Sequence, residues 1–150
     1  MRRVCCVWLA VLLPAFAADS GGRAEYVGGT VGHVPLKSAG RLHTSDGETL
    51  LFEFKGHAIQ VRYEKINLLE YGQDTGRRYL LALAVSPILL ISKARKHFLT
   101  VAFKEEDGRQ QAMVFRVHKS DVRAVLASLE ARTGLKVNYQ DNEARKAGGG

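Results

Sequence analysis

The chain has 150 residues, of which 46% are hydrophobic and 25% are charged, and this length suits a single domain with a sizeable core. Lys and Arg outnumber Asp and Glu by 22 to 15. The two cysteines, Cys5 and Cys6, lie close to the N-terminus, so a disulfide framework or a thiolate metal site in the rest of the chain is excluded.

Residues 1–17 have the three-part pattern of a cleavable secretory signal peptide. Arg2 and Arg3 supply a positive start, residues 4–13 are apolar, and an Ala-Phe-Ala ending places small residues before the cleavage point. The apolar run is shorter than the roughly 20 residues that span a bilayer. We therefore expect export, with cleavage after residue 17 and a periplasmic or extracellular location. An uncleaved anchor or a buried first strand is the alternative.

Once this signal peptide is removed, the basic charge of the chain resides in one segment. Removing Arg2 and Arg3 leaves 20 Lys and Arg against 15 Asp and Glu, a net charge of +5. Residues 77–97 hold five basic residues and no acidic residue, so the remainder of the exported chain is balanced. The basic residues of the segment and its final histidine are Arg77, Arg78, Lys93, Arg95, Lys96 and His97.

Short runs of alternating apolar and polar residues follow a Gly- and Ser-containing lead-in at 18–25, which we expect to be flexible. The alternation has the period of two that is typical of half-buried β-strands. In the third run, Leu50, Phe52 and Phe54 share one face. The Lys55-Gly56-His57 sequence after it is suited to a tight reversal. The expected strands are residues 26–34, 40–44, 50–55, 59–63 and 66–71.

A second hairpin is predicted farther along the chain. Asp107-Gly108 is a strong turn signal, and an alternating run stands on either side of it. The apolar residues expected to face the core are Leu99, Val101 and Phe103 before the turn and Met113, Phe115 and Val117 after it. The chain therefore carries strands on both sides of the basic segment.

After this hairpin the apolar residues recur at helical spacing. Ser120 is a suitable N-cap and Gly134 a suitable C-terminal stop, which predicts an amphipathic helix over 120–133. Residues 135–139 are expected to add a short extended piece, and the polar residues 141–150 a disordered tail. The apolar stripe of the helix is Val122, Val125, Leu126 and Leu129.

Many short antiparallel strands followed by one C-terminal amphipathic helix resemble the order found in pleckstrin-homology-like (PH-like) domains. In that family two bent antiparallel sheets form an open barrel, and the helix plugs one end. Residues 66–72 (INLLEYG) and 93–101 (KARKHFLTV) are similar to a group of small exported bacterial proteins of unknown function with a PH-like or GRAM-like core. The resemblance covers about residues 26–140. It implies a mainly β fold, a β-rich α+β domain with one C-terminal capping helix.

Two departures separate the chain from phosphoinositide-binding PH domains. Those domains carry basic residues in an early strand–strand loop, whereas residues 43–48 here include Asp46 and Glu48 and no Lys or Arg. The expected helix also lacks the tryptophan typical of the superfamily. The resemblance therefore does not imply a phosphoinositide role.

No catalytic, metal-binding or cofactor-binding motif is present. The five histidines lack the close spacing of a zinc motif, and there is no G-x-S-x-G nucleophile elbow. The glycine-rich residues 28–32 lack the Lys-Ser/Thr of a P-loop and lead into β-sequence, not into a helix. We therefore expect a protein that is not an enzyme and that has no metal ion and no cofactor.

The remaining candidate for function is the segment 77–97, in which apolar residues 79–91 stand between basic flanks. The ordinary arrangement for such a run is packing in the core with solvated basic ends, since soluble monomers rarely expose so large an apolar patch. The alternative is a contact surface for another protein or for anionic lipid headgroups, which attract basic residues. Nucleic acid is not an expected partner, because the basic charge is local and the protein is exported.

These observations predict an exported binding or scaffolding module of unknown ligand, with the five basic residues and His97 named above as its candidate contact residues. Peripheral attachment to an anionic membrane surface is the first alternative. An enzyme or small-ligand carrier with a pocket at the open end of the barrel is the second.

Overall fold

The computed structural model describes residues 21–73, 97–140 and 142–149. The expected signal peptide and all of the basic segment except His97 lie outside the described residues. The elements in chain order are β1 (Gly22–Gly29), β2 (Ser38–His43), β3 (Thr49–Phe54), β4 (His57–Arg62), the short 3-10 helix η1 (Tyr63–Lys65), β5 (Ile66–Gly72), β6 (His97–Lys104), β7 (Gln110–Val117), α2 (Val122–Thr133), β8 (Asn138–Tyr139) and α3 (Asn142–Gly148).

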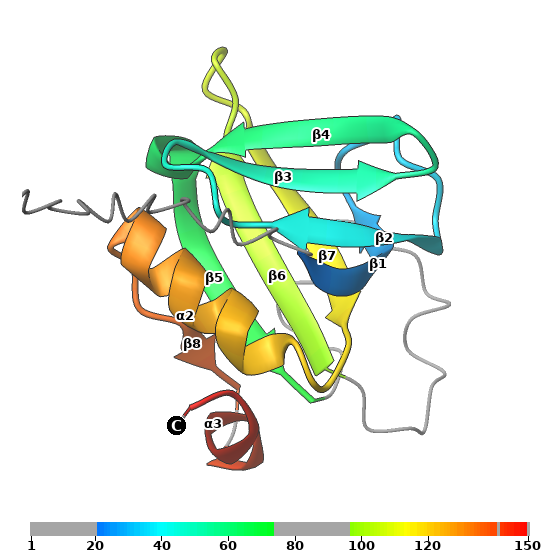
Figure 1. The fold of residues 1–150 in the computed structure, drawn as a ribbon. Helices are drawn as coiled ribbons and strands as arrows, with labels where there is room; N and C mark the ends of the chain where they lie inside the picture. Colours follow the sequence, from blue (N-terminus) through cyan, green and yellow to red (C-terminus); the bar gives the residue numbers. More distant parts are fainter. Residues whose placement is uncertain (1–20, 74–96, 141, 150) are drawn as a thin grey trace, which may run out of the picture.

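The strands of the described chain form one mixed sheet in the order β4-β3-β2-β1-β7-β6-β5-β8. All neighbouring pairs are antiparallel except β5 and β8, which are parallel. The sheet bends so that β2, β3 and β4 cross over β5, β6 and β7, and α2 lies alongside both layers (Figure 1). The mainly β prediction is confirmed, and the sheet is open, with β4 and β8 at its two edges.

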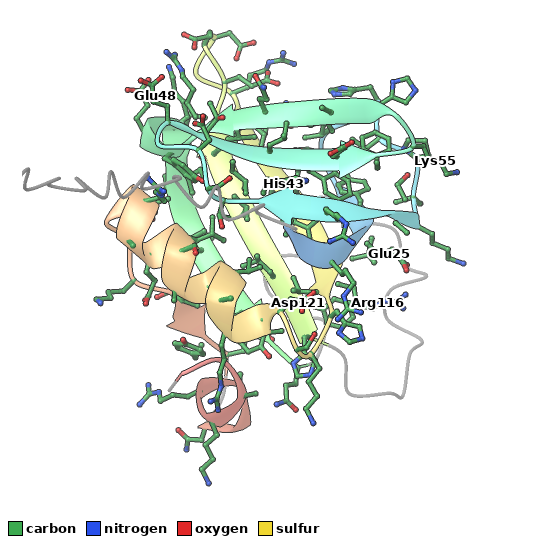
Figure 2. The ribbon with its side chains drawn as sticks, viewed as in Figure 1. Glu25, His43, Glu48, Lys55, Arg116 and Asp121 are labelled. Atoms are coloured by element: carbon green, nitrogen blue, oxygen red, sulfur yellow. The ribbon has the colours of Figure 1, made fainter. Side chains whose placement is uncertain are left out.

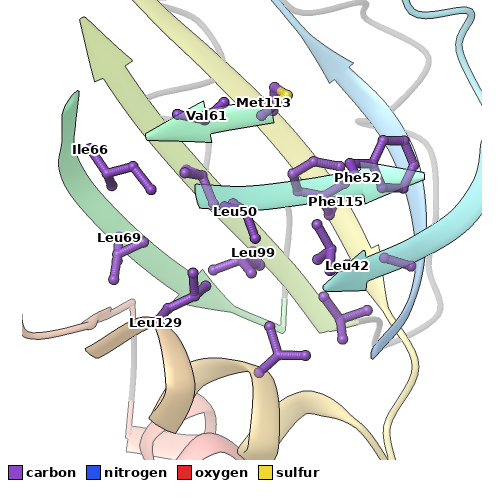
Figure 3. Close-up of a cluster of buried hydrophobic side chains, with 14 of the residues drawn as sticks. Leu42, Leu50, Phe52, Val61, Ile66, Leu69, Leu99, Met113, Phe115 and Leu129 are labelled. Carbon is purple, nitrogen blue, oxygen red and sulfur yellow. The ribbon is translucent and has the colours of Figure 1, made fainter. Parts of the chain in front are cut away.

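The core fills the space between the two layers and α2 (Figure 3). Leu50 and Phe52 enter it from β3, and Leu99 and Phe115 enter it from the opposite layer; each is at most 1% exposed. The Phe115 ring lies 4.9 Å from the Phe52 ring, centroid to centroid. Leu129 of α2 is fully buried in the same cluster, so the helix packs on the core as its apolar stripe predicts.

Both predicted turns join neighbouring strands. Lys55 and Gly56 have φ values of 45° and 78°, the left-handed conformations required by a two-residue hairpin loop between β3 and β4. At the second turn, Gly108 has φ 83° and donates its backbone N–H to the Glu105 carbonyl at 3.0 Å. The alternating pattern also assigns the core faces correctly, because Phe52, Val101 and the other predicted inward residues of these strands are buried.

The first strand begins earlier than expected. Residues 22–25, predicted to belong to a flexible lead-in, form the start of β1 and pair with β2. The physical reason is the close approach of α2, because a Cβ on Gly22 would lie only 2.3 Å from a Val125 methyl carbon. Gly22 is thus a packing contact and not a flexible joint. At the other end, β1 stops at Gly29, so residues 31–34 are loop and not strand.

The C-terminal region is also more ordered than predicted. Gly134 ends α2 as expected, with φ 71° and a 2.9 Å hydrogen bond from its N–H to the Glu130 carbonyl. The chain then adds β8 to β5 and forms α3 at residues 142–148, where a disordered tail was expected. Ala144 is fully buried among core residues, which explains why the helix is held in place.

The start of α2 differs from the prediction as well. Asp121, not Ser120, occupies the N-cap position, and its side chain makes no capping hydrogen bond to the helix. Both side chains are engaged by Arg23 of β1 instead. The prediction therefore placed the N-cap one residue too early. The Ser120 hydroxyl bonds to Arg23 of β1 and does not cap the helix.

Candidate functional site

His97 is the one predicted contact residue that the structure describes. The other five, Arg77, Arg78, Lys93, Arg95 and Lys96, lie outside the described residues. Gly72 of β5 pairs with Phe98 of β6, so the chain leaves and re-enters the sheet at adjacent positions. His97, at the start of β6, marks the described end of the basic segment.

The His97 side chain is held against a buried tyrosine. Its ring is nearly parallel to that of Tyr71, at 8° and 6.1 Å between centroids, and its Nδ1 is hydrogen-bonded to the Tyr71 hydroxyl. Partial burial lowers the pKa of His97 below its ordinary value of 6.5, and the positive charge of Lys119 and the proximity of His118 lower it further. The imidazole is therefore mainly neutral at pH 7.

A groove of about 480 Å³ lies beside His97. Its walls come from β1, β2, the end of β7 and the two residues after β7. The small or apolar lining residues are Ala24, Ala39, Gly40 and Val117, and the polar ones are Arg23, Glu25, His97, Arg116, His118 and Lys119. We call this the His97 groove. Figure 2 shows Glu25 and Arg116 on this side of the molecule, with Asp121 near the start of α2.

Two ion pairs fix the arginines of the His97 groove. Arg116 bonds to Glu25, which lies directly opposite it on the neighbouring strand. Arg23 bonds through Nε to Asp121 Oδ2 at 3.0 Å, and its backbone N–H donates to the same oxygen at 2.9 Å. These bonds hold the pKa of Asp121 well below its usual range. The arginines are thus oriented before any ligand arrives.

The positive charge of the His97 groove is not fully balanced. Lys119 is exposed and forms no ion pair within the described part of the chain. Without counting the two histidines, the cations Arg23, Arg116 and Lys119 exceed the carboxylates Glu25 and Asp121 by one positive charge. The groove can therefore hold a carboxylate or another small anionic group beside an apolar wall.

Ser120, His118 and Asp121 lie together but do not form a catalytic triad. Ser120 Oγ lies 2.9 Å from His118 Nδ1, but its hydroxyl is also placed to donate to Asp121 Oδ1. Arg23 Nη2 lies 3.0 Å from the same His118 nitrogen and donates to the Ser120 oxygen at 2.7 Å. A triad needs the carboxylate on the far nitrogen of the histidine, where it orients the base. Here the three residues brace the start of α2 against β1.

A second groove, of about 400 Å³, lies along β4. Its apolar lining is Val31, Ile59, Val61 and Phe103, and its polar lining includes His33, Gln60, Arg62, Lys65, Lys104, Glu105 and Glu106. Glu106 of the second hairpin is paired with Arg62 at 2.6 Å and with Lys65 at 3.3 Å. We call this the β4 groove.

The sequence did not single out the other polar residues of the His97 groove. Arg23, Arg116 and Lys119 are far apart in the chain, and only the pairing of β1 with β7 brings them together. The register Glu25↔Arg116 was not inferable from alternation alone. The one signal for this register in the sequence was that Glu25 and Arg116 have opposite charges and both occupy outward positions on strands.

Neither a metal-binding cluster, nor a membrane-spanning helix, nor a similar known protein assigns a function to the described residues. Within residues 21–73, 97–140 and 142–149, no three His, Asp or Glu side chains are close enough to hold a metal ion. None of the described helices has the length and hydrophobicity needed to cross a membrane. Neither a scan of known protein families nor a search of curated proteins finds a match to this chain.

Proposed function

We propose that this protein is an exported, non-enzymatic binding module that uses the His97 groove and the adjoining residues 77–97 to hold an acidic segment of another protein. The observation that carries the proposal is the excess positive charge of a concave groove that includes His97, the last residue of the most basic segment in the sequence. Lys96 directly precedes His97, so the two features are continuous along the chain.

The shape of the groove favours a protein partner over a membrane. An anionic bilayer attracts basic residues on a surface that can approach the headgroups. The His97 groove is hollow, and its lining combines cations with Ala24, Ala39 and Val117. Such a mixture suits a side chain or a short segment that enters the groove and buries apolar atoms next to its carboxylate.

The polar groups of this groove also suit recognition better than catalysis. Arg116 is paired with Glu25, and the Ser120 hydroxyl is placed to donate to Asp121. The His97 ring is fixed by Tyr71. A general base must be free to reach a proton on the substrate. In contrast, prearranged ion pairs lower the ordering cost of binding a charged partner.

We further propose that the fold is PH-like. The order of the strands, the crossing of β2–β4 over β5–β7 and the position of α2 support this proposal (Figure 1). The departures found in the sequence remain, so no phosphoinositide role is attached to it. A binding module with a varied ligand surface is consistent with this architecture.

The test compares an acidic peptide with an anionic vesicle. The peptide alternates glutamate with alanine, and the vesicle contains phosphatidylglycerol and phosphatidylcholine. We expect the peptide to bind the wild-type chain. Lys119→Gln should weaken the affinity for the peptide about two- to fivefold, because it removes one exposed charge contact. Replacing Arg77, Arg78, Lys93, Arg95 and Lys96 by Gln should weaken it further.

The control is Lys136→Gln, which removes an exposed charge on the loop after α2. This variant should bind like the wild type. Equal weakening by Lys119→Gln and Lys136→Gln would show that only net charge matters and would contradict the groove. Sedimentation with vesicles in the absence of peptide binding would replace the proposal by peripheral membrane attachment.

A further inference from the structure

The strand β4 forms one lateral edge of the sheet, with β3 as its sole strand partner among the described residues. The two-residue turn makes Phe54 and His57 a hydrogen-bonded pair, and bonded and non-bonded pairs alternate from there. His57 and every second residue after it therefore direct their backbone groups to β3. The residues whose N–H and C=O point away from the sheet are Ala58, Gln60 and Arg62.

The Arg62 carbonyl is used by η1, because Arg62 is the N-cap of that helix. No described residue bonds to the other outward backbone groups. The usual protections of an edge strand are proline, a bulge, an inward-pointing charge or a covering element. β4 contains no proline, its pairing with β3 has no register shift, and its inward side chains are Ile59 and Val61. The strand is thus a regular template for one more strand.

The β4 groove adjoins this edge and supplies an apolar contact. Val31 and Phe103 lie across the groove from β4, and both are buried. A strand added to β4 would place alternate side chains toward this apolar lining, since side chains alternate between the two faces of a strand. The volume of about 400 Å³ lies in the range of ordinary ligand sites.

The charges of the β4 groove favour an acidic partner over a second copy of this chain. Glu106 is paired with Arg62 and Lys65, and Glu105 is paired with Arg109 at 2.9 Å. Lys104 lines the same groove and forms no ion pair within the described residues. β4 itself carries no acidic side chain, so the β4 strand of a second copy would offer no carboxylate to Lys104.

We propose that β4 binds an extended, acidic segment of a partner polypeptide by strand addition. The partner's backbone would bond to Ala58, to Gln60 and to the N–H of Arg62. One of its apolar side chains would enter the β4 groove, and a neighbouring carboxylate would lie near Lys104. A polypeptide is the occupant because an extended chain repeats its donors and acceptors at the spacing of the outward groups on β4. This surface is separate from the His97 groove, and the inference stands without the function proposed above.

The test uses isotope-labelled protein and a short acetylated peptide in which valine alternates with glutamate. Saturation with the peptide should slow amide hydrogen exchange at Ala58, Gln60 and Arg62 at least about tenfold, because new hydrogen bonds protect these amides. The amides of Ile59 and Val61, already bonded to β3, should change much less. Unchanged exchange at all five positions would overturn the proposal.

Two N-methylated versions of the peptide provide the sharpest control, because they leave the protein unaltered. One is methylated on the odd backbone nitrogens and the other on the even ones. Only one of these sets can face β4, so one version should bind and the other should bind at least roughly tenfold more weakly. Equal binding of both versions would show that the peptide does not add as a strand.

Protein variants test the edge and the charge separately. Gln60→Pro removes an outward N–H without removing a bond to β3. It should weaken the affinity for the peptide roughly tenfold. Unchanged amide resonances of β1 and β7 would show that the fold is retained. Lys104→Gln should weaken the affinity for the peptide less than Gln60→Pro does. The matched Lys136→Gln should leave this affinity unchanged. Protection of the β4 amides by concentrated protein without peptide would identify a second copy as the occupant and would contradict the acidic partner.

Discussion

The two lateral sides of the sheet differ in how their backbone groups are used. On the β5 side, β8 adds two residues, the Gln140 N–H donates to the Tyr71 carbonyl at 3.0 Å, and the Gln140 side chain donates to Glu70 at 3.0 Å. On the β4 side, no described element adds to the strand. The difference teaches that a very short strand protects an edge when a side chain and a packed helix anchor it.

The largest effect is expected from the helix that leads the chain to β8. Leu129 of α2 is fully buried between the layers, so Leu129→Ala should lower the free energy of unfolding by about 2–5 kcal/mol. Urea denaturation would measure this loss. The matched control is Ala127→Ser on the exposed side of the same helix, which should cost less than about 0.5 kcal/mol. Similar losses in both variants would mean that α2 does not pack as described.

A smaller and more local effect is expected from α3. Ala144 is fully buried, so Ala144→Asp should detach α3 and lower the free energy of unfolding by about 1–3 kcal/mol, because an unpaired carboxylate cannot remain buried there. Hydrogen exchange should then accelerate at Gln140 and leave the β4 amides unchanged. Arg145→Asp, on the exposed side of α3, is the control and should preserve the slow exchange of Gln140. Faster exchange on both sides of the sheet would show that the two edges are not independent.

The smallest effect is a dependence of stability on pH. The pKa of His97 is lower in the folded protein than its ordinary value of 6.5, because of burial and then the nearby Lys119 and His118. The unfolded chain therefore takes up the proton more readily, and stability is retained above pH 6.5 and decreases as the pH falls from 6.5 through the lowered pKa. Urea midpoints at several pH values would measure the slope.

His97→Gln is the control for this slope. It removes the titrating group and should make the urea midpoint less sensitive to pH between 6.5 and the lowered pKa of His97. A slope that is unchanged in His97→Gln would assign the pH dependence to another group.

Much of the fold could be predicted from local patterns. Alternation identified the strands and their inward residues, such as Leu50 and Phe52, and the turn at Lys55-Gly56 followed from the backbone freedom of glycine. The change of period identified α2, and Gly134 identified its end. These features depend on neighbours in the sequence, which is why they could be read directly.

The other features depend on contacts between distant segments. β8 and α3 have no strong period of their own and are held by β5 and α2, so the sequence indicated only a short extended piece and a polar tail. Gly22 was interpreted as flexible because its packing partner, Val125, lies in the helix. The His97 groove requires the register of β1 against β7, and five of the predicted contact residues lie outside the described chain.

The pairing of β1 with β7 also has a consequence for how the chain folds. Glu25 and Arg116 are 91 residues apart, whereas the strands within β1–β4 and within β5–β7 are joined in sequence order. Pairing over such a distance requires the closure of a long loop before contacts compensate for it, and folding slows accordingly. A chain that emerges from a ribosome N-terminus first must expose one side of its first strand until residue 117 has appeared. The two halves of the sheet can therefore begin to form separately, and joining them is the late step.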